Sequence, residues 1–182
     1  MSFVDDVEQV VRRYANVADS AVQQSQIDDA LAVLCGPGSG GILWRHYRTY
    51  AIEMGRVDKQ IERYRWLRSL EISAAPDVVA RFPIAEGAQV IALRYWATRE
   101  DEDLIRAATP GISFTQQARE QLMHDIDTLA NHGHRHLYAG RGLNYWSVGS
   151  ESGVITLHGW SALVQGTSGE DHAAVEALLA TR

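Results

Sequence analysis

Three histidines, His132, His134 and His136, alternate with other residues in the segment NHGHRHLY. Imidazole is a good ligand for zinc and related ions, and alternate residues of a strand point to the same face. Because Gly133 is expected to end a helix, only His134 and His136 are expected to share a strand face. We therefore take His134 and His136 as candidate metal ligands of a small metal-dependent enzyme, one of the functional alternatives. The sequence assigns no catalytic residue.

A second candidate is the segment CGPGSGG, in which Gly36, Gly38 and Gly41 match the pattern G-x-G-x-x-G. It resembles the first nucleotide-binding loop of dinucleotide-dependent enzymes and methyltransferases, which implies a nucleotide or S-adenosylmethionine site over Gly36–Gly41. A loop of that kind follows a buried strand. The residues before this one, QIDDALAVLC, carry apolar side chains at helical spacing, and glycine followed by proline commonly ends a helix. We predict a helix end without a cofactor, with the nucleotide site as the alternative.

The third candidate is a series of basic residues at intervals of mostly three or four positions, namely Arg45, Arg48, Arg56, Lys59 and Arg63. The segment 43–68 carries seven Lys and Arg against three Asp and Glu, whereas the whole chain has a net charge of −6. Arginine pairs well with carboxylates, and charge complementarity gives specificity and fast association. We predict that these five residues bind an acidic protein surface, including that of a second copy. The acidic remainder of the chain opposes the approach of nucleic acid.

These basic residues need an element that presents them together. Apolar residues in the same segment recur in steps of four and three, which is typical of a heptad seam, and they are Leu43, Tyr47, Tyr50, Met54, Val57, Ile61 and Tyr64. The spacing predicts one long amphipathic helix over residues 42–70, with the basic residues opposite the seam. A helix over residues 2–23 could pack against it as a helical hairpin, or the long helix could pair with a copy of itself.

The fold class predicted from the whole chain is α+β. Residues 1–85 are expected to be helical, and Pro83 and Gly87 mark a boundary near residue 85. Residues 86–182 predict a small antiparallel sheet packed with helices: a strand over 88–96, a helix from about 113 to 132, glycine-separated strands from 135 onward and a last helix over 169–181. Strands that cluster in sequence are typical of this class, and we expect the two regions to form one compact unit.

The composition limits the class of protein. The chain has 182 residues, of which 46% are hydrophobic and 22% are charged, as in an ordinary globular domain. Cys35 is the only cysteine, so no internal disulfide can form. No signal peptide and no membrane-spanning run is recognised, so we expect a cytoplasmic protein without membrane contact. The leading expectation for function is a non-enzymatic interaction protein that binds a protein partner, or forms a homodimer or another homo-oligomer, through its long helix.

Overall fold

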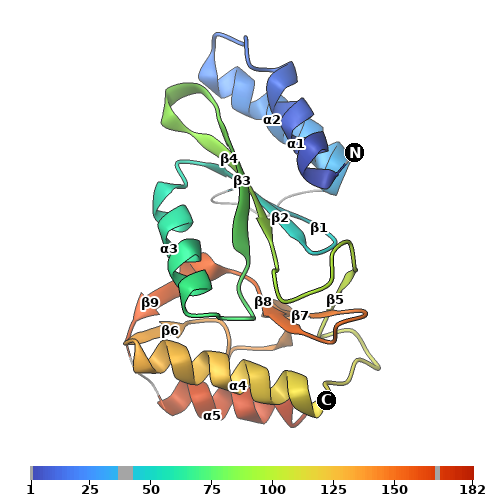
Figure 1. Cartoon of the computed structure of the whole chain (residues 1–182), viewed down its shortest axis with the longest axis vertical. Helices are drawn as coiled ribbons and strands as arrows, with labels where there is room; N and C mark the ends of the chain where they lie inside the picture. Colours follow the sequence, from blue (N-terminus) through green and yellow to red (C-terminus); the bar gives the residue numbers. More distant parts are fainter. Residues whose placement is uncertain (1, 37–42, 167–168) are drawn as a thin grey trace. The chain divides into compact units, whose positions relative to one another are not determined.

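The computed structural model of the protein describes residues 2–36, 43–166 and 169–182 (Figure 1). It confirms the α+β class, because helices and antiparallel strands occupy separate stretches of the described chain. Contacts between residues divide the chain into two compact units. The first comprises Met1–Arg65 and Asp77–Arg94, and the second comprises Trp66–Pro76 and Tyr95–Arg182. In the described residues no helix is both long and apolar enough to cross a membrane.

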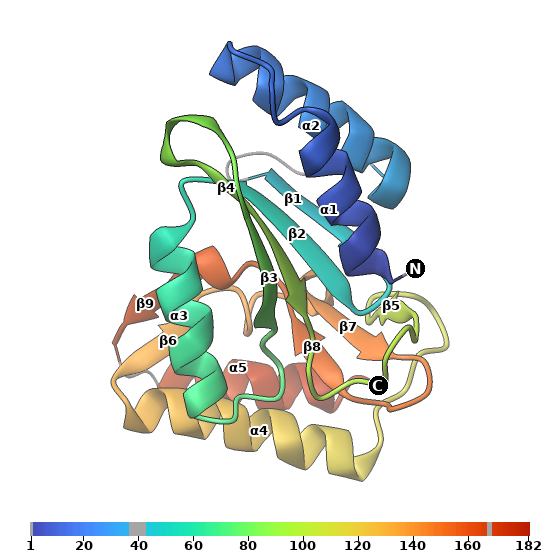
Figure 2. The same cartoon turned by 45° about the horizontal axis from the view of Figure 1, so that its top comes forward.

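The first unit pairs two helices with a four-stranded antiparallel sheet (Figure 2). Its helices are α1 (Phe3–Arg13) and α2 (Ser20–Cys35). The strands are β1 (Leu43–Tyr47), β2 (Tyr50–Gly55), β3 (Asp77–Pro83) and β4 (Gln89–Arg94), in the order β1-β2-β4-β3. The strand expected over 88–96 is thereby confirmed as β4. A short 3-10 helix, η1 (Ala85–Gly87), connects β3 to β4 across the predicted boundary at residue 85.

Strand β2 organises this unit because its side chains alternate between the two faces of the sheet. Tyr50, Ile52 and Met54 join the hydrophobic core with buried residues of α1 and α2, which are Phe3, Val7, Val11, Ile27 and Leu31. Glu53 points to the other face, where it accepts a hydrogen bond from the Tyr64 hydroxyl on helix α3 (Asp58–Ser69). Burial raises the pKa of Glu53, against the opposing effect of that hydrogen bond.

The predicted single helix over residues 42–70 is wrong. Residues 43–55 form the antiparallel hairpin of β1 and β2, and only Asp58–Ser69 is helical. The chain turns at Arg48, whose φ of 50° lies in the left-handed region, and Tyr47 pairs with Tyr50 across the turn. Aromatic and β-branched residues favour strands, and pairing of β2 with β4 buries them. The apolar seam was therefore a mixture of strand and helix positions.

The predicted helical hairpin is consequently wrong as well. Its first helix, expected over residues 2–23, ends at Arg13, and α2 starts at Ser20. The division lies between two caps: Tyr14 is the C-cap of α1, with its N–H bonded to the Val11 carbonyl, and Asp19 caps the start of α2 by accepting from the N–H groups of Ala21 and Val22. Residues 1–85 are not all helical, because they also contain β1, β2 and β3.

The second unit packs two helices with short antiparallel strands. Helices α4 (Gln116–Asn131) and α5 (Gly169–Leu179) lie side by side (Figure 1). The strands β5 (Leu104–Arg106), β7 (Trp146–Gly149) and β8 (Ile155–Leu157) form one sheet, and β6 (His134–His136) pairs with β9 (Leu163–Gln165). Two 3-10 turns, η2 (Leu143–Tyr145) and η3 (Trp160–Ala162), complete the unit. The predicted helices near 113–132 and 169–181 and the clustered strands are confirmed.

Candidate functional sites

The five basic residues predicted to bind a partner do not lie on one helix. Arg45 stands on β1 with only 4% of its surface exposed, and its guanidinium pairs with Asp28 of α2 and donates to the carbonyl of Gly36. Arg48 stands at the β1–β2 turn, with its guanidinium carbon 5.5 Å from the centroid of the Tyr47 ring. The other three lie immediately before α3 or on it. The prediction of a single basic face on one helix is therefore wrong. Arg45 instead connects β1 to α2 within the first unit.

A smaller basic surface remains on the solvent side of α3. Arg56, Lys59 and Arg65, which we call the α3 basic cluster, are exposed, whereas Ile61 and Tyr64 are buried. The three cations have no acidic partner within the described part of the chain. Arg65 was not in the predicted series because it follows Arg63 by two positions and so does not fit the spacing of three and four residues.

Two carboxylates, Asp58 and Glu62, lie on α3 close in sequence to the α3 basic cluster. Asp58 accepts a hydrogen bond from the Gln89 side chain at 2.8 Å and lies 3.9 Å from the Arg81 guanidinium. Glu62 is exposed on the same helix. Arg63 is half-buried. When Arg81 of β3 is added, this surface has four exposed cations against the two carboxylates Asp58 and Glu62. Its net charge is therefore positive.

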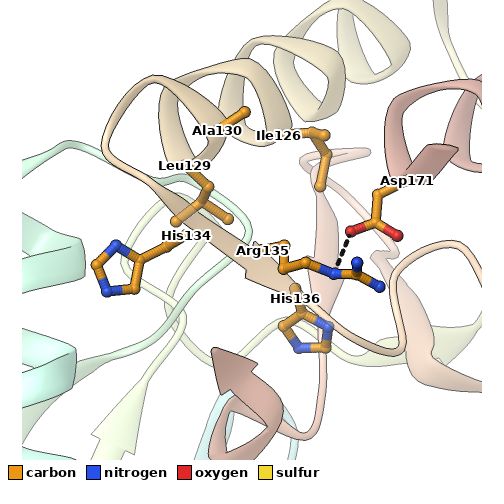
Figure 3. Close-up of a pocket in the computed structure, with 7 residues that line it drawn as sticks. All are labelled: Ile126, Leu129, Ala130, His134, Arg135, His136 and Asp171. Carbon is orange, nitrogen blue, oxygen red and sulfur yellow. Dashed lines mark ion pairs between the residues drawn. The ribbon is translucent and has the colours of Figure 1, made fainter. Parts of the chain in front are cut away.

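His134 and His136 lie on β6, as predicted, but their rings contact different tryptophans. The His134 ring centroid is 4.6 Å from that of Trp66, and its Nδ1 atom donates to the carbonyl of His132 at 2.8 Å. The His136 ring meets Trp160 edge-on at 4.7 Å between centroids. The two imidazoles extend from β6 in different directions (Figure 3). The rings of His134 and His136 therefore do not converge on a common position for a metal ion.

The surroundings of His136 keep its imidazole neutral. The residue is 1% exposed, and burial lowers its pKa to about 4, against the opposing effect of the backbone groups of His136 and His158. Its Nδ1 atom accepts a hydrogen bond from the Tyr138 N–H at 3.3 Å, so the proton of the neutral ring resides on Nε2. Neutral imidazole can bind a metal, but this ring is enclosed by protein.

A small pocket separates β6 from α5 (Figure 3). It is lined by His134, His136, Arg135 and Asp171 together with apolar residues of α4, and the Arg135 Nε atom lies 2.8 Å from Asp171 Oδ2. The cavity volume of about 10 Å³ has room for about one water molecule. Among the described residues no three His, Cys, Asp or Glu side chains are grouped to hold a metal ion. The metal site thus stays a prediction without a third ligand.

The glycine loop follows a helix, as the sequence indicated. Helix α2 ends at Cys35, and Gly36, with a φ of 86°, is its C-terminal cap. Gly38 and Gly41 lie outside the described residues, so the alternative of a nucleotide or S-adenosylmethionine site at Gly36–Gly41 stays untested. Burial raises the pKa of the Cys35 thiol to about 11, although Arg45 opposes the shift. At neutral pH Cys35 is therefore a thiol with little nucleophilic character.

Asp125 is a functional candidate that the sequence analysis missed. It is 1% exposed, its Oδ2 atom accepts from the Ala74 N–H at 2.8 Å, and its Oδ1 atom accepts from Gln121 Nε2 at 3.1 Å. Burial raises its pKa to about 6, although these hydrogen bonds act in the opposite direction. The signal was present in the sequence, because Asp125 follows Leu122 by three positions and precedes Leu129 by four, on the apolar face of α4.

A second polar network was also missed. The Tyr95 hydroxyl donates to the Leu157 carbonyl at 2.8 Å and therefore accepts from His158 Nδ1 at 3.1 Å, while His158 Nε2 accepts from the Ser147 hydroxyl at 2.7 Å. Serine, histidine and an orienting group are the parts of a nucleophilic site. Ser147, however, is 4% exposed on the middle strand of its sheet. The network accordingly holds β7, β8 and Tyr95 together.

Comparisons with known proteins were made for the whole chain. No protein-family model matches it, and no curated protein matches it. Among solved structures, the one described as "Structure of vaccinia related kinase 3" is similar with a TM-score of 0.41 and 12% sequence identity. The match covers 76% of this chain and 50% of that chain. A likeness at this TM-score and identity carries no argument about fold or function.

Proposed function

We propose that this protein is a non-enzymatic interaction protein that binds an acidic protein surface through the α3 basic cluster. The observation that carries the proposal is that Arg56, Lys59 and Arg65 are exposed and lack acidic partners in the described chain. Because these cations form no internal ion pair, binding a partner does not require one to be broken. Arg45, buried and paired with Asp28, is excluded from the binding surface.

The charge of the rest of the chain supports an acidic protein as the partner. The chain carries a net charge of −6, so the basic cluster lies within an acidic molecule that repels nucleic acid at a distance. Screening by salt acts over about 8 Å at physiological ionic strength, so a partner carboxylate close to the cluster is still attracted. A second copy of this chain also has acidic surface, and homodimerisation is one form of the proposal. A cytoplasmic location belongs to it as well, with Cys35 as a free thiol.

The edge of the sheet in the first unit favours contact through side chains. Strand β3 is an edge strand of that sheet, and its register shifts between Val78 and Ala80, which marks a bulge. Pro83, at its end, has no N–H to donate, and the side chain of Arg81 is 41% exposed. Bulges, prolines and charged side chains are the usual means by which edge strands avoid pairing with other chains. A partner is thus expected to meet this unit through charged side chains.

Charge reversal tests the proposal. The combined variant Arg56→Glu, Lys59→Glu and Arg65→Glu should weaken partner binding at least about tenfold, mainly through slower association, because each change replaces attraction with repulsion. Light scattering of the purified protein first shows whether the partner is a second copy. Otherwise immobilised protein captures partners from cell extract at two salt concentrations, and binding of the purified partner is then measured by surface plasmon resonance.

The matched control carries the same change of charge elsewhere. Arg12→Glu, Arg13→Glu and Arg106→Glu alter three exposed arginines that are not part of α3 and should leave the association rate within about a factor of three. Equal loss of binding in both variants would show a general effect of net charge. Unchanged binding in the α3 variant would contradict the proposal.

A further inference from the structure

A second cavity of the second unit contains no residue of the α3 basic cluster in its lining. It has a volume of about 220 Å³ and is lined by the first two turns of α4, the β7–β8 turn and two residues from other segments. The lining residues are Ser73, Ala97, Thr115, Gln117, Ala118, Gln121, Leu122, Ser152, Gly153, Val154 and Ile155. Leu122, Ala118 and Ile155 are buried, whereas Gln117 and Gln121 are exposed. The cavity therefore has an apolar floor and a polar rim.

The volume sets the size of a ligand. An apolar cavity of about 150 Å³ is large enough for benzene, so this cavity has room for a ring with a small substituent. It is at the small end for ligand sites, which commonly measure roughly 300 Å³ or more. A compact molecule fits better than a nucleotide or a peptide.

The lining has no charged side chain, which determines the charge of the ligand. An ion that leaves water needs a partner of opposite charge, and without one its transfer is very unfavourable. Two carboxylates lie behind the walls. Asp125 holds Gln121, and Glu102 accepts from the N–H groups of Glu151 and Ser152 at 2.8 and 2.9 Å. An anion would be repelled by both, and a cation would find no carboxylate in the lining with which to form a direct ion pair.

Two polar side chains that line the cavity, Ser73 and Gln117, have no hydrogen-bond partner among the described residues. Ser73 is 9% exposed, and its hydroxyl is unpaired, although its backbone N–H serves Asp125. The other two hydroxyls already make hydrogen bonds: Thr115 accepts from the Ala118 N–H, and Ser152 accepts from the Val154 N–H and bonds to the Glu102 carboxylate. Gln121 uses one of its N–H groups on Asp125 and retains its carbonyl oxygen. Ser73, Gln117 and Gln121 are therefore available to a ligand, and of these Ser73 is the buried one.

Hydrogen bonds to the Glu102 carboxylate fix the β7–β8 turn, which forms one wall of the cavity. Glu102 is buried, and burial would raise the pKa of its carboxyl, but hydrogen bonds from Ser152, Glu151 and Arg99 outweigh that effect and lower it. The ionised carboxylate thus holds the β7–β8 turn at neutral pH. A prearranged wall reduces the ordering cost of binding.

We propose that this cavity is a binding site for a compact, uncharged cyclic molecule with an amide or hydroxyl group. The ring rests on Leu122, Ala118 and Ile155, and the polar substituent exchanges hydrogen bonds with Ser73 and Gln121. The site is independent of the α3 basic cluster, so either proposal can fail alone.

An isosteric series of probes tests the site. Benzamide, benzoate and benzamidine have the same shape and differ in charge. Titration of the ¹⁵N-labelled protein, followed by NMR, should give saturable shifts for benzamide with a Kd of about 1 mM or tighter, centred on residues 73, 117–122 and 152–155. Benzoate and benzamidine should bind at least about tenfold more weakly. The absence of saturable shifts with benzamide, or equal binding of all three probes, would overturn the proposal.

Variants connect the shifts to the cavity. Ala118→Phe fills the cavity and should weaken benzamide binding at least about tenfold, whereas Gln116→Phe places the same ring on an exposed position of α4 and should leave it unchanged. The spectrum without probe shows whether each variant is folded. Should Ala118→Phe fail to fold, Val154→Phe fills the cavity from the β7–β8 turn. A folded, filled variant with undiminished affinity would place binding elsewhere.

Discussion

Between pH 7 and pH 4 the second unit is expected to lose about 3 kcal/mol of stability through His136 alone. Burial lowers the pKa of the His136 imidazole to about 4 in the folded chain, from its ordinary value of 6.5 in the unfolded chain. Between these values the unfolded chain binds a proton that the folded chain does not, so the contribution is complete above pH 6.5 and declines as the pH falls toward 4. Each pKa unit corresponds to about 1.4 kcal/mol.

The variant His136→Phe measures this loss. Phenylalanine keeps a ring against Trp160 and cannot titrate, so its free energy of unfolding should fall about 3 kcal/mol less than that of the wild type over this pH range. Urea unfolding at several pH values, followed by tryptophan fluorescence, provides the measurement, and four of the five tryptophans belong to the second unit. His132→Asn controls for the removal of an exposed imidazole. Parallel curves for His136→Phe and wild type would refute the expectation.

Asp125 is expected to act in the opposite direction. Burial raises its pKa to about 6 in the folded chain from its ordinary value of 3.8, so the folded state retains a proton that the unfolded state has released. The resulting stabilisation is complete below pH 3.8 and is lost as the pH rises through 6, with a total of about 3 kcal/mol. In the wild type this gain on acidification offsets the loss at His136, and the two effects largely cancel.

Asp125→Asn should separate the two effects. The amide oxygen can still accept from the Ala74 N–H, and the residue no longer carries a buried charge. The stability of the variant relative to wild type should rise by about 3 kcal/mol between pH 4 and pH 7. The same unfolding measurements apply, with Glu120→Gln, an exposed change on the same helix, as the control. A difference from wild type that stays constant with pH would exclude the proposed ionisation.

Local patterns predicted the two helices of the second unit and its strands from residue 134 onward, but not the strand β5. The apolar repeat of α4, the glycines between short strands and the turn between β7 and β8 each depend on neighbours in sequence, and all are present. The segment 43–55 failed because its apolar spacing fits either a helix or a strand, and the decision comes from pairing with β4 about 40 residues later. Tertiary pairing of this kind leaves no mark in a local window.

The candidate sites were less predictable than the elements. Arg45 looked like its neighbours in the basic series, yet an ion pair with Asp28, 17 residues earlier, removes it from the surface. The cavity near Ser73 brings together segments that are distant in sequence, and none of them carries a motif. The helix end at Gly36 was predictable because a cap depends on only a few consecutive residues.

Trp66–Pro76 belongs to the second unit, although the chain before and after it builds the first. This short segment contains the buried residues Leu67 and Ile72. It also contains Ala74, whose N–H donates to Asp125 and whose carbonyl accepts from the Leu157 N–H at 2.9 Å. A fragment that begins at residue 95 would lack these groups. Truncation at one point therefore cannot isolate either unit, and recombination that transplants one of them must rejoin the polypeptide at three breaks.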